Sequence, residues 1–199
     1  MRFLALSPHT DDCEFGCGGV IARRVSEGHS VHIAAFSSCG EPALVQESLQ
    51  ATDVLGIAGS STHFFDFPAR NFPSHRQAIL DAMIRIREDL QPDVVFLPCT
   101  ADTHQDHEVI RQEGFRAFKQ ITVLGYELPW NNISFSADVF ITLSQEDLAR
   151  KIRALECYKS QTTRYYASPT SVEALVRVRG TQIGAKRAEA FEVIRWVMK

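Results

Sequence analysis

The sequence contains no long hydrophobic run. It opens on MRFLALSPH, in which one arginine and a short apolar stretch precede a charged segment. A secretory signal needs a longer apolar core, and a membrane helix needs about 20 apolar residues. We therefore expect neither a signal peptide nor a membrane span, and the opening stretch predicts a first β-strand.

The cysteines do not form a disulfide framework. There are five of them, an odd number without regular spacing, which is typical of a reducing compartment and predicts a cytoplasmic protein. Cys13 and Cys17 are close enough in sequence to suggest a thiolate metal site, but Cys39, Cys99 and Cys157 are isolated. Packing or incidental thiols are the favoured interpretation.

Positive charge is not in excess. Lysine and arginine number 21 against 24 acidic residues, which gives a net charge of −3. A nucleic-acid-binding surface or a polybasic membrane patch requires clustered basic residues, and the sequence has no such cluster. We expect a small-molecule partner, with neither nucleic acid nor membrane, and the sequence leaves open whether the chain forms a homo-oligomer.

Short apolar runs alternate with segments of helical period. Strands are predicted at 2–6, 30–37, 62–67 and 92–99, and helices at 14–27, 42–56 and 73–91. This order predicts an α/β fold with a mostly parallel sheet and helices on both faces. A length of 199 residues suits a single domain, 1–199.

The pattern is less regular after Thr122. Two further strands are predicted at 122–127 and 137–143, followed by a helix at 144–160 with Ser144 as its N-cap. The tail is ambiguous between helix and strand. The glycines of GCGG at 16–19 lack the spacing of a dinucleotide loop, so we expect them to let a helix pack closely on the sheet.

Two polar clusters follow predicted strands. SPHTDDCE occupies 7–14 after the first strand, and TADTHQDH occupies 100–107 after the fourth. Ligands of such sheets bind at the carboxyl ends of the strands, so the two clusters can converge on one point. Taken singly, His9 is typical of a loop at the end of a strand, and the pair Asp11 and Asp12 is typical of a helix N-cap.

Two imidazoles and one carboxylate with an open position describe a catalytic zinc site. His9 and Asp12 are three residues apart on a turning segment, and His107 supplies a third ligand. Asp11 is left free beside the metal as a proton acceptor, because adjacent side chains on an extended segment point apart. His104 is then available to act on the substrate.

The carboxylates near His104 have an expected supporting role. Asp106 or Asp102 is predicted to fix the tautomer of His104 and stabilise its charged form. The expected ion is Zn²⁺, one per chain, with Fe²⁺ as the alternative.

These motifs resemble those of the PIG-L/LmbE-like deacetylase family. SPHTDDCEFGCGGVIA resembles its (A/P)HPDDE signature, and DTHQDH resembles its second metal motif. The likeness continues through PDVVFLP, YKSQ at 158–161, RG at 179–180 and AEAF at 188–191. It therefore covers nearly the whole chain.

The resemblance implies a Rossmann-like three-layer sandwich and zinc-dependent removal of an acetyl group from an N-acetylated sugar. It implies zinc ligation by His9, Asp12 and His107, with Asp11 as general base and His104 as electrostatic catalyst. The chain departs from the usual motif at Thr10, where proline is common, and at Cys13, where glutamate is common, while Glu14 keeps an acidic residue as in a D-D-x-E branch. We expect Glu14 near the site together with Asp102 and Asp106.

Two loops have less specific patterns. Arg70 in FPARNF (67–72) is expected either to bind the substrate or to lie on the surface with its stem packed on Phe67 or Phe72. The apolar and aromatic loop 128–135 is expected either to line the pocket mouth or to form a subunit contact.

The expected function is therefore a zinc-dependent amidohydrolase acting on the N-acetyl amide of an amino sugar or sugar conjugate. A facial-triad Fe(II) oxygenase and a non-catalytic metal- or carbohydrate-binding protein are the alternatives. Neither needs both a spare carboxylate and a second imidazole, which Asp11 and His104 provide. The substrate's identity depends on loops whose sequence carries no readable code.

Overall fold

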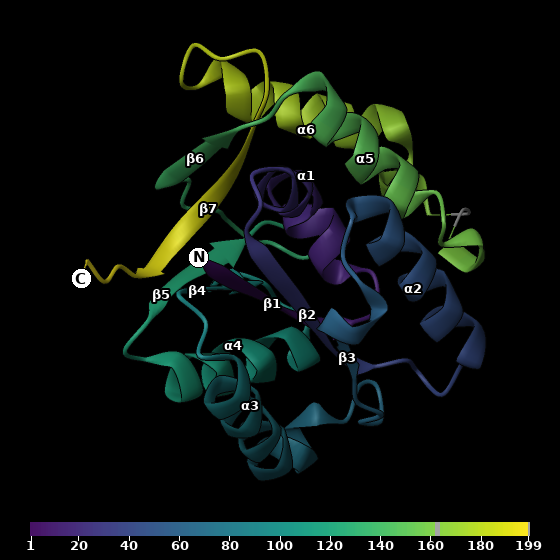
Figure 1. Cartoon of the computed structure of the whole chain (residues 1–199), viewed down its shortest axis with the longest axis vertical. Helices are drawn as coiled ribbons and strands as arrows, with labels where there is room; N and C mark the ends of the chain where they lie inside the picture. Colours follow the sequence, from purple (N-terminus) through teal and green to yellow (C-terminus); the bar gives the residue numbers. More distant parts are fainter. Residues whose placement is uncertain (162–163, 199) are drawn as a thin grey trace.

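Five parallel strands form the larger part of one seven-stranded sheet (Figure 1). The computed structural model describes residues 1–161 and 164–198. The parallel strands are β1 (Arg2–His9), β2 (Ser30–Ser37), β3 (Thr62–Phe64), β4 (Val94–Pro98) and β5 (Thr122–Tyr126), in the order β3-β2-β1-β4-β5. The sheet continues with β7 (Ala188–Arg195), antiparallel to β5, and ends at β6 (Val139–Thr142).

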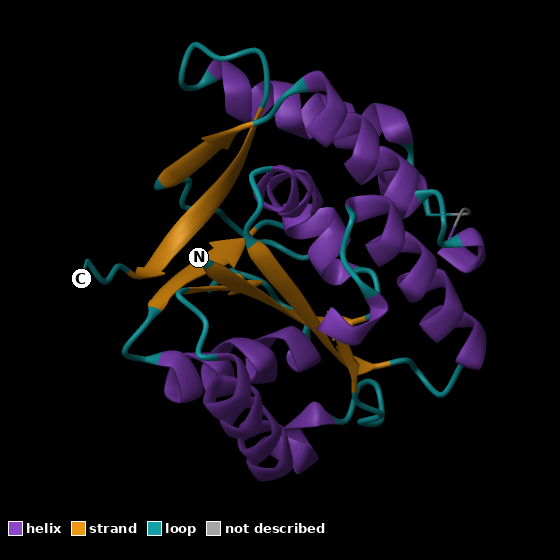
Figure 2. Cartoon of the chain, viewed as in Figure 1, coloured by secondary structure: helices purple, strands orange, loops and turns teal. Residues whose placement is uncertain are grey.

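Helices cover both faces of this sheet (Figure 2). One face carries α1 (Asp12–Ser26), α2 (Pro42–Leu55), α5 (Gln145–Leu155) and α6 (Pro169–Thr181), and the other carries α3 (Arg76–Leu90) and α4 (Gln105–Phe118). Short 3₁₀ turns lie at Gly59–Ser61, Phe72–His75, Lys159–Gln161 and Tyr165–Ala167. The predicted α/β fold with helices on both faces is confirmed.

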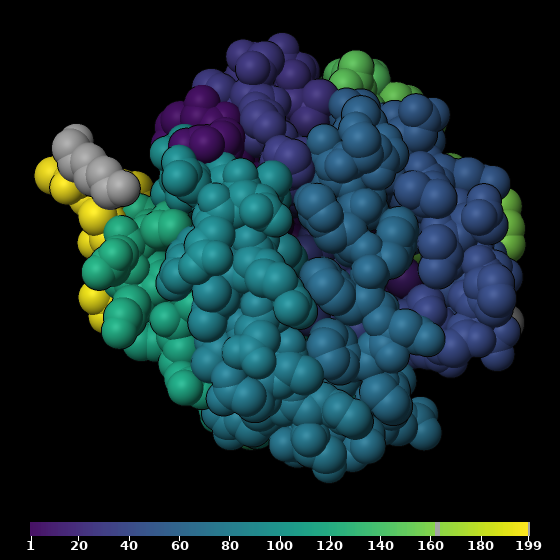
Figure 3. Space-filling view, turned by 60° about the horizontal axis from the view of Figure 1, so that its bottom comes forward, coloured from purple at the N-terminus to yellow at the C-terminus, as the bar shows by residue number. Residues whose placement is uncertain are grey.

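The strands divide their side chains between two cores. On β1, Phe3 and Ala5 belong to the cluster beneath α1 and α2, while Leu4 and Leu6 belong to the cluster beneath α3 and α4. Alternate residues of a strand point to opposite faces, so a strand buried on both sides is apolar throughout. Figure 3 shows the outer surface of the α3 side, with the C-terminal segment in yellow at its edge.

Most predicted elements form close to their expected bounds, with a few differences. The first strand, predicted at 2–6, continues to His9, and the helix predicted at 144–160 ends at Leu155. The third strand ends at Phe64, although the backbone N–H groups of Phe65 and Phe67 still donate to Ala35 O and Phe36 O of β2, and Pro68 then has no N–H to continue the pairing. The predicted helix 73–91 begins only at Arg76, after a 3₁₀ turn. The ambiguous tail contains both a helix, α6, and a strand, β7. Among the described residues, no helix has the length and apolar character needed to cross a membrane.

Helix α1 is interrupted at Cys17, where φ is −144°. The interruption frees backbone N–H groups, and the buried carboxylate of Glu189 accepts from Gly19 N at 3.0 Å and Val20 N at 2.7 Å. Lys151 Nζ lies 2.6 Å from the same carboxylate. Because a buried polar group is costly without a partner, this ion pair stabilises a helix break that the sequence does not reveal.

The glycines of α1 allow the close packing expected from the sequence. A Cβ atom on Gly16 would lie 2.3 Å from the Tyr126 ring, and one on Gly19 would lie 2.5 Å from Leu143. The two positions therefore set how near α1 approaches the sheet and the segment that leads into α5. This places the start of α1, with its acidic residues, directly against the carboxyl end of β1.

The close approach at Gly16 can be tested by adding one methyl group. We expect Gly16→Ala to lower the free energy of unfolding by about 1–3 kcal/mol, because Tyr126 is fully buried and cannot move aside freely. Gly59→Ala is the matched control, since its Cβ would meet nothing nearer than 3.9 Å. Equal urea midpoints for the two variants would contradict this account of the packing.

Candidate active site

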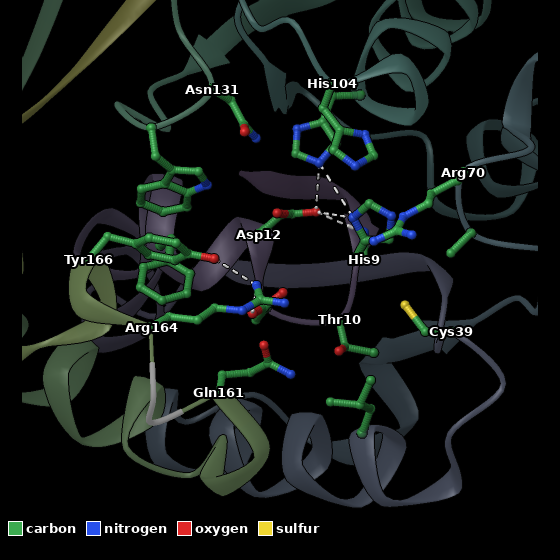
Figure 4. Close-up of a pocket in the computed structure, with 16 residues that line it drawn as sticks. His9, Thr10, Asp12, Cys39, Arg70, His104, Asn131, Gln161, Arg164 and Tyr166 are labelled. Carbon is green, nitrogen blue, oxygen red and sulfur yellow. Dashed lines mark hydrogen bonds and ion pairs between the residues drawn. The ribbon is translucent and has the colours of Figure 1, made fainter.

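The two predicted polar clusters meet where the order of the strands reverses. Strands β1 and β4 are neighbours, but β1 leads to β2 on one side and β4 leads to β5 on the other. In open α/β sheets such a switch point leaves a crevice at the carboxyl ends of the strands. A pocket of about 280 Å³ lies there (Figure 4), and its lining includes His9, Asp11, Asp12, Arg70, His104 and His107.

Three atoms of the predicted metal ligands form a compact triangle in this pocket. Asp12 Oδ2 lies 3.1 Å from His9 Nδ1 and 3.2 Å from His107 Nε2, and the two nitrogens lie 3.4 Å apart. Ligands of a tetrahedral zinc ion at about 2.0–2.1 Å are separated by about 3.3 Å. The triangle therefore has the dimensions that three ligands of one zinc ion require, which fits the expected metal.

Carboxylates behind the histidines fix which nitrogen faces the triangle. Asp106 Oδ2 lies 3.1 Å from His9 Nε2, and Asp102 Oδ2 lies 2.7 Å from His107 Nδ1. A carboxylate on the outer nitrogen orients a metal-binding imidazole and increases its basicity. The expectation that one of these carboxylates fixes the tautomer of His104 was wrong, because their imidazole partners are His9 and His107, although the charge of Asp106 does favour the charged form of His104.

The electrostatics of the triangle favour positive charge. Burial lowers the pKa of both imidazoles, but Asp106 and Asp12 outweigh it at His9 and raise that pKa to about 9. Asp12 and Asp102 likewise raise the pKa of His107 to about 10. Burial raises the pKa of Asp12, yet the adjacent imidazoles bring it well below its usual range. The carboxylates that raise these pKa values also favour a metal cation, which must displace the imidazole protons in order to bind.

His104 lies at the N-cap of α4, beside the triangle. Its Nδ1 accepts a hydrogen bond from the backbone N–H of Asp106 at 3.1 Å, so a neutral imidazole carries its proton on Nε2. Burial and the charges of His107 and His9 lower the pKa of His104. The expected tautomer control therefore comes from a backbone group, and the environment favours a neutral N–H donor over a charged imidazole.

His104 is also the alternative third metal ligand. Nitrogens of His9, His104 and His107 all lie within 4.8 Å of one another. The triangle that includes Asp12 is tighter, with no edge longer than 3.4 Å. The distances therefore favour Asp12 as the third ligand and leave His104 beside it.

The Asp11 carboxylate is available for chemistry. Asp11 is the N-cap of α1, yet its side chain makes no capping hydrogen bond. Burial and the adjacent Asp12 charge raise the pKa of Asp11 to about 6, against the opposing effect of Arg164, whose Nη1 lies 3.9 Å from Asp11 Oδ2. A carboxylate with a raised pKa is a stronger base than an exposed one.

Arg70 enters the same pocket from the loop after β3. Its backbone is left-handed, with φ of 64°, and its N–H donates to Asp106 Oδ2 at 2.5 Å. Its carbonyl accepts from the side chain of Gln105. Strained backbone is tolerated where surrounding contacts determine it, and here the contacts direct the loop toward the triangle.

Glu14 lies apart from the triangle in a buried network. Its carboxylate accepts from Tyr158 OH at 2.8 Å and from Cys13 Sγ at 3.0 Å. Burial raises the pKa of Glu14 to about 7 despite these donors. Tyr158 OH also donates to Thr10 O at 2.5 Å, so the network supports the loop that carries the site rather than the ligands themselves.

Several pocket residues had no role assigned from the sequence. Trp130 and Asn131 of the loop 128–135 line the pocket, which agrees with one of the two expectations for that loop. Other parts of the wall come from Cys39, Gln161, Arg164 and Tyr166 (Figure 4). Thr103 N donates to Asn131 O at 3.0 Å, so this loop is joined to the one that carries His104. The motif YKSQ at 158–161, which contains Gln161, was the feature of the sequence that could have indicated this part of the wall.

Known proteins resemble this chain in sequence. The family pattern described as PIG-L: GlcNAc-PI de-N-acetylase matches residues 4–118. The uncharacterized deacetylase YaiS of Escherichia coli (strain K12) is 30% identical over 168 residues, which cover 79% of this chain and 90% of that protein. The diacetylchitobiose deacetylase of Thermococcus kodakarensis is 25% identical over 137 residues, covering 62% of this chain and 50% of that protein.

Solved structures share the fold. The conserved protein TT1542 from Thermus thermophilus has a TM-score of 0.82 at 25% identity, covering 99% of this chain and 96% of that one. GalB, the 4-carboxy-2-hydroxymuconate hydratase of Pseudomonas putida KT2440, also has a TM-score of 0.82, at 19% identity with 100% and 98% covered. Because a hydratase has this fold, the fold alone does not decide the reaction.

The metal ligands can be tested by metal content. We expect His107→Ala to lose most of its zinc after equilibration with Zn²⁺ and removal of excess ion, because one corner of the triangle is gone. Inductively coupled plasma mass spectrometry gives the occupancy, and His32→Ala, on β2 outside the pocket, is the control. Full zinc occupancy in His107→Ala would remove this residue from the ligand set.

The same measurement separates the two candidate third ligands. If Asp12 completes the site, Asp12→Ala loses zinc and His104→Ala keeps it. The reverse result would support the three-histidine arrangement.

Proposed function

Because the chain belongs to the PIG-L family, we propose that it is a zinc-dependent amidohydrolase that removes the acetyl group from an N-acetylated amino sugar or sugar conjugate. The observation that carries the proposal is the triangle of His9 Nδ1, Asp12 Oδ2 and His107 Nε2, within a pocket that Asp11 and His104 also line. The family description and the diacetylchitobiose deacetylase support an N-acetyl sugar as substrate.

His9, Asp12 and His107 would hold the metal. A bound Zn²⁺ acidifies water and polarises a carbonyl, which is the chemistry that amide hydrolysis needs. The carboxylates of Asp106 and Asp102 keep the two imidazoles oriented toward the ion. Iron is the alternative ion, but an oxygenase is not favoured because the related proteins are deacetylases and because Asp11 and His104 suit hydrolysis.

Asp11 acts as the proton carrier. It accepts the proton of the water that attacks the carbonyl carbon of the acetamide. The C–N bond then breaks, and Asp11 returns the proton to the departing sugar nitrogen, so acetate and a free amine are the products. Its side chain is suited to both steps, since it lines the pocket without serving as a helix cap.

His104 stabilises the negative charge that develops on the carbonyl oxygen. Its Nε2–H donates to that oxygen, while Nδ1 remains bonded to the backbone N–H of Asp106. A donor that is already oriented contributes most in the transition state, because nothing must reorganise as charge develops. A neutral donor is sufficient for this role.

The reaction itself is tested by measuring acetate and free amine released from N-acetylglucosamine and its glycosides by zinc-loaded protein. We expect release in equal amounts, with none after chelation of the metal. A protein that binds zinc and sugar but releases neither product would support the non-catalytic alternative.

The base is tested with Asp11→Asn. We expect this variant to keep its zinc and to lose activity by about 10²- to 10⁴-fold, because a carboxamide cannot accept the proton of water. Zinc content and turnover are measured on the same sample. Near wild-type turnover in the loaded variant would contradict the assignment.

The oxyanion donor is tested with His104→Ala. We expect kcat to fall by about 10²- to 10³-fold while KM changes little, since the interaction is made in the transition state. His104→Gln, which keeps a neutral N–H donor, should lose less. A variant that mainly raises KM would make His104 a substrate-binding residue instead.

A further inference from the structure

A second cavity lies against the candidate active site. Its volume is about 370 Å³, and it shares Phe15, Trp130 and Tyr166 with the pocket that contains the triangle. The Trp130 and Tyr166 rings are stacked, with centroids 3.8 Å apart and planes inclined by 12°. Phe15 meets both rings edge-on, at 5.1 Å and 5.6 Å. One aromatic wall therefore separates the two spaces.

The rest of the second cavity is mainly apolar. Helix α6 contributes Val172, Ala174, Leu175 and Val178, and Pro129 and Tyr165 lie nearby in its wall. Three of the eight large hydrophobic side chains that are exposed in the described part of the chain line it, namely Trp130, Tyr165 and Val178. Exposed apolar side chains gathered around a cavity indicate a binding surface.

The charged residues in its wall are already neutralised. Glu127 accepts two hydrogen bonds from the Arg179 guanidinium, at 2.5 Å and 2.9 Å. Lys151 Nζ is paired with Glu189 at 2.6 Å. A ligand in this cavity therefore meets paired charges and hydrocarbon, a combination that favours an apolar group over a second sugar, whose hydroxyls would lose their water partners there.

We infer that the second cavity binds an apolar group attached to the anomeric oxygen of the N-acetylated sugar. The preferred substrates are then alkyl or aryl glycosides rather than the free sugar. In a 2-acetamido sugar the amide nitrogen is on C2 and the glycosidic oxygen is on the neighbouring C1, so the attached group leaves the sugar beside the reacting amide. This inference rests on the proposed deacetylase function. The acyl part of an acetamide ends in a methyl group, which is too small to fill the second cavity.

The test compares glycosides that differ only in chain length. Zinc-loaded protein is assayed for amine release from the methyl and n-hexyl glycosides of N-acetylglucosamine, below the micelle concentration. Each buried CH₂ group is worth roughly fourfold in binding, and part of the chain stays exposed at Tyr165 and Val178. We expect kcat/KM to be at least about tenfold higher for the hexyl glycoside.

Two variants locate the effect. Ala174→Phe fills the cavity from an exposed position on α6, and Val178→Asp adds a charge to its wall from a second exposed position. Both should reduce the hexyl-to-methyl ratio of kcat/KM toward 1. Ala78→Phe is the matched control, an exposed alanine on α3 outside both cavities, and should keep the wild-type ratio.

The outcomes distinguish this inference from the proposed function. Release from the methyl glycoside without a hexyl preference, or a preference that both cavity variants retain, would overturn the inference and leave the deacetylase proposal standing. No release from any glycoside would overturn the proposed function. A chain-length preference found on an N-hexanoyl amide instead would assign the cavity to the acyl group and also overturn the inference.

Discussion

The buried carboxylate of Asp106 joins three segments that are far apart in the sequence. It bonds His9 Nε2 from β1 and accepts from the backbone N–H groups of Arg70 at 2.5 Å and Phe72 at 3.2 Å, in the loop before α3. Its own backbone N–H bonds His104 Nδ1. A buried negative charge is costly unless such donors compensate it. Compensation of this one charge therefore sets the orientation of the His9 imidazole and the position of the Arg70 loop, while the backbone N–H of the same residue sets the tautomer of His104.

The position of this charge follows from strand order, which is why much of the site could be predicted. The apolar runs of β1, β2 and β4 are continuous, as expected for strands covered on both faces, and they alternate with helical segments. A parallel sheet brings the carboxyl ends of β1 and β4 together, so His9 and His107 had to be close once both strands were recognised. The fold class is confirmed, and the metal ligands remain a prediction that the triangle supports.

Features that depend on distant partners could not be predicted. The break in α1 at Cys17 needs Glu189, which is 170 residues away from Gly19. Strand β7 comes last in the sequence but lies between β5 and β6, so no local pattern indicates its antiparallel neighbours. The sequence offers His104 two nearby carboxylates, Asp102 and Asp106, and only the folded geometry shows that both face other histidines. Local periodicity carries no information on such pairings.

The two spaces beside the aromatic wall differ because of how the fold uses its charges. On the side of the triangle, Asp11, Asp12 and Arg164 remain at the pocket surface. On the other side, Lys151 is paired with Glu189, the residue that stabilises the break in α1. Glu127 is paired with the guanidinium of Arg179. The same ion pair that stabilises the break in α1 therefore also neutralises a charge in the wall of the neighbouring cavity. A polar group and an apolar group require opposite surroundings, and the two spaces on either side of the stacked Trp130 and Tyr166 rings differ in this way.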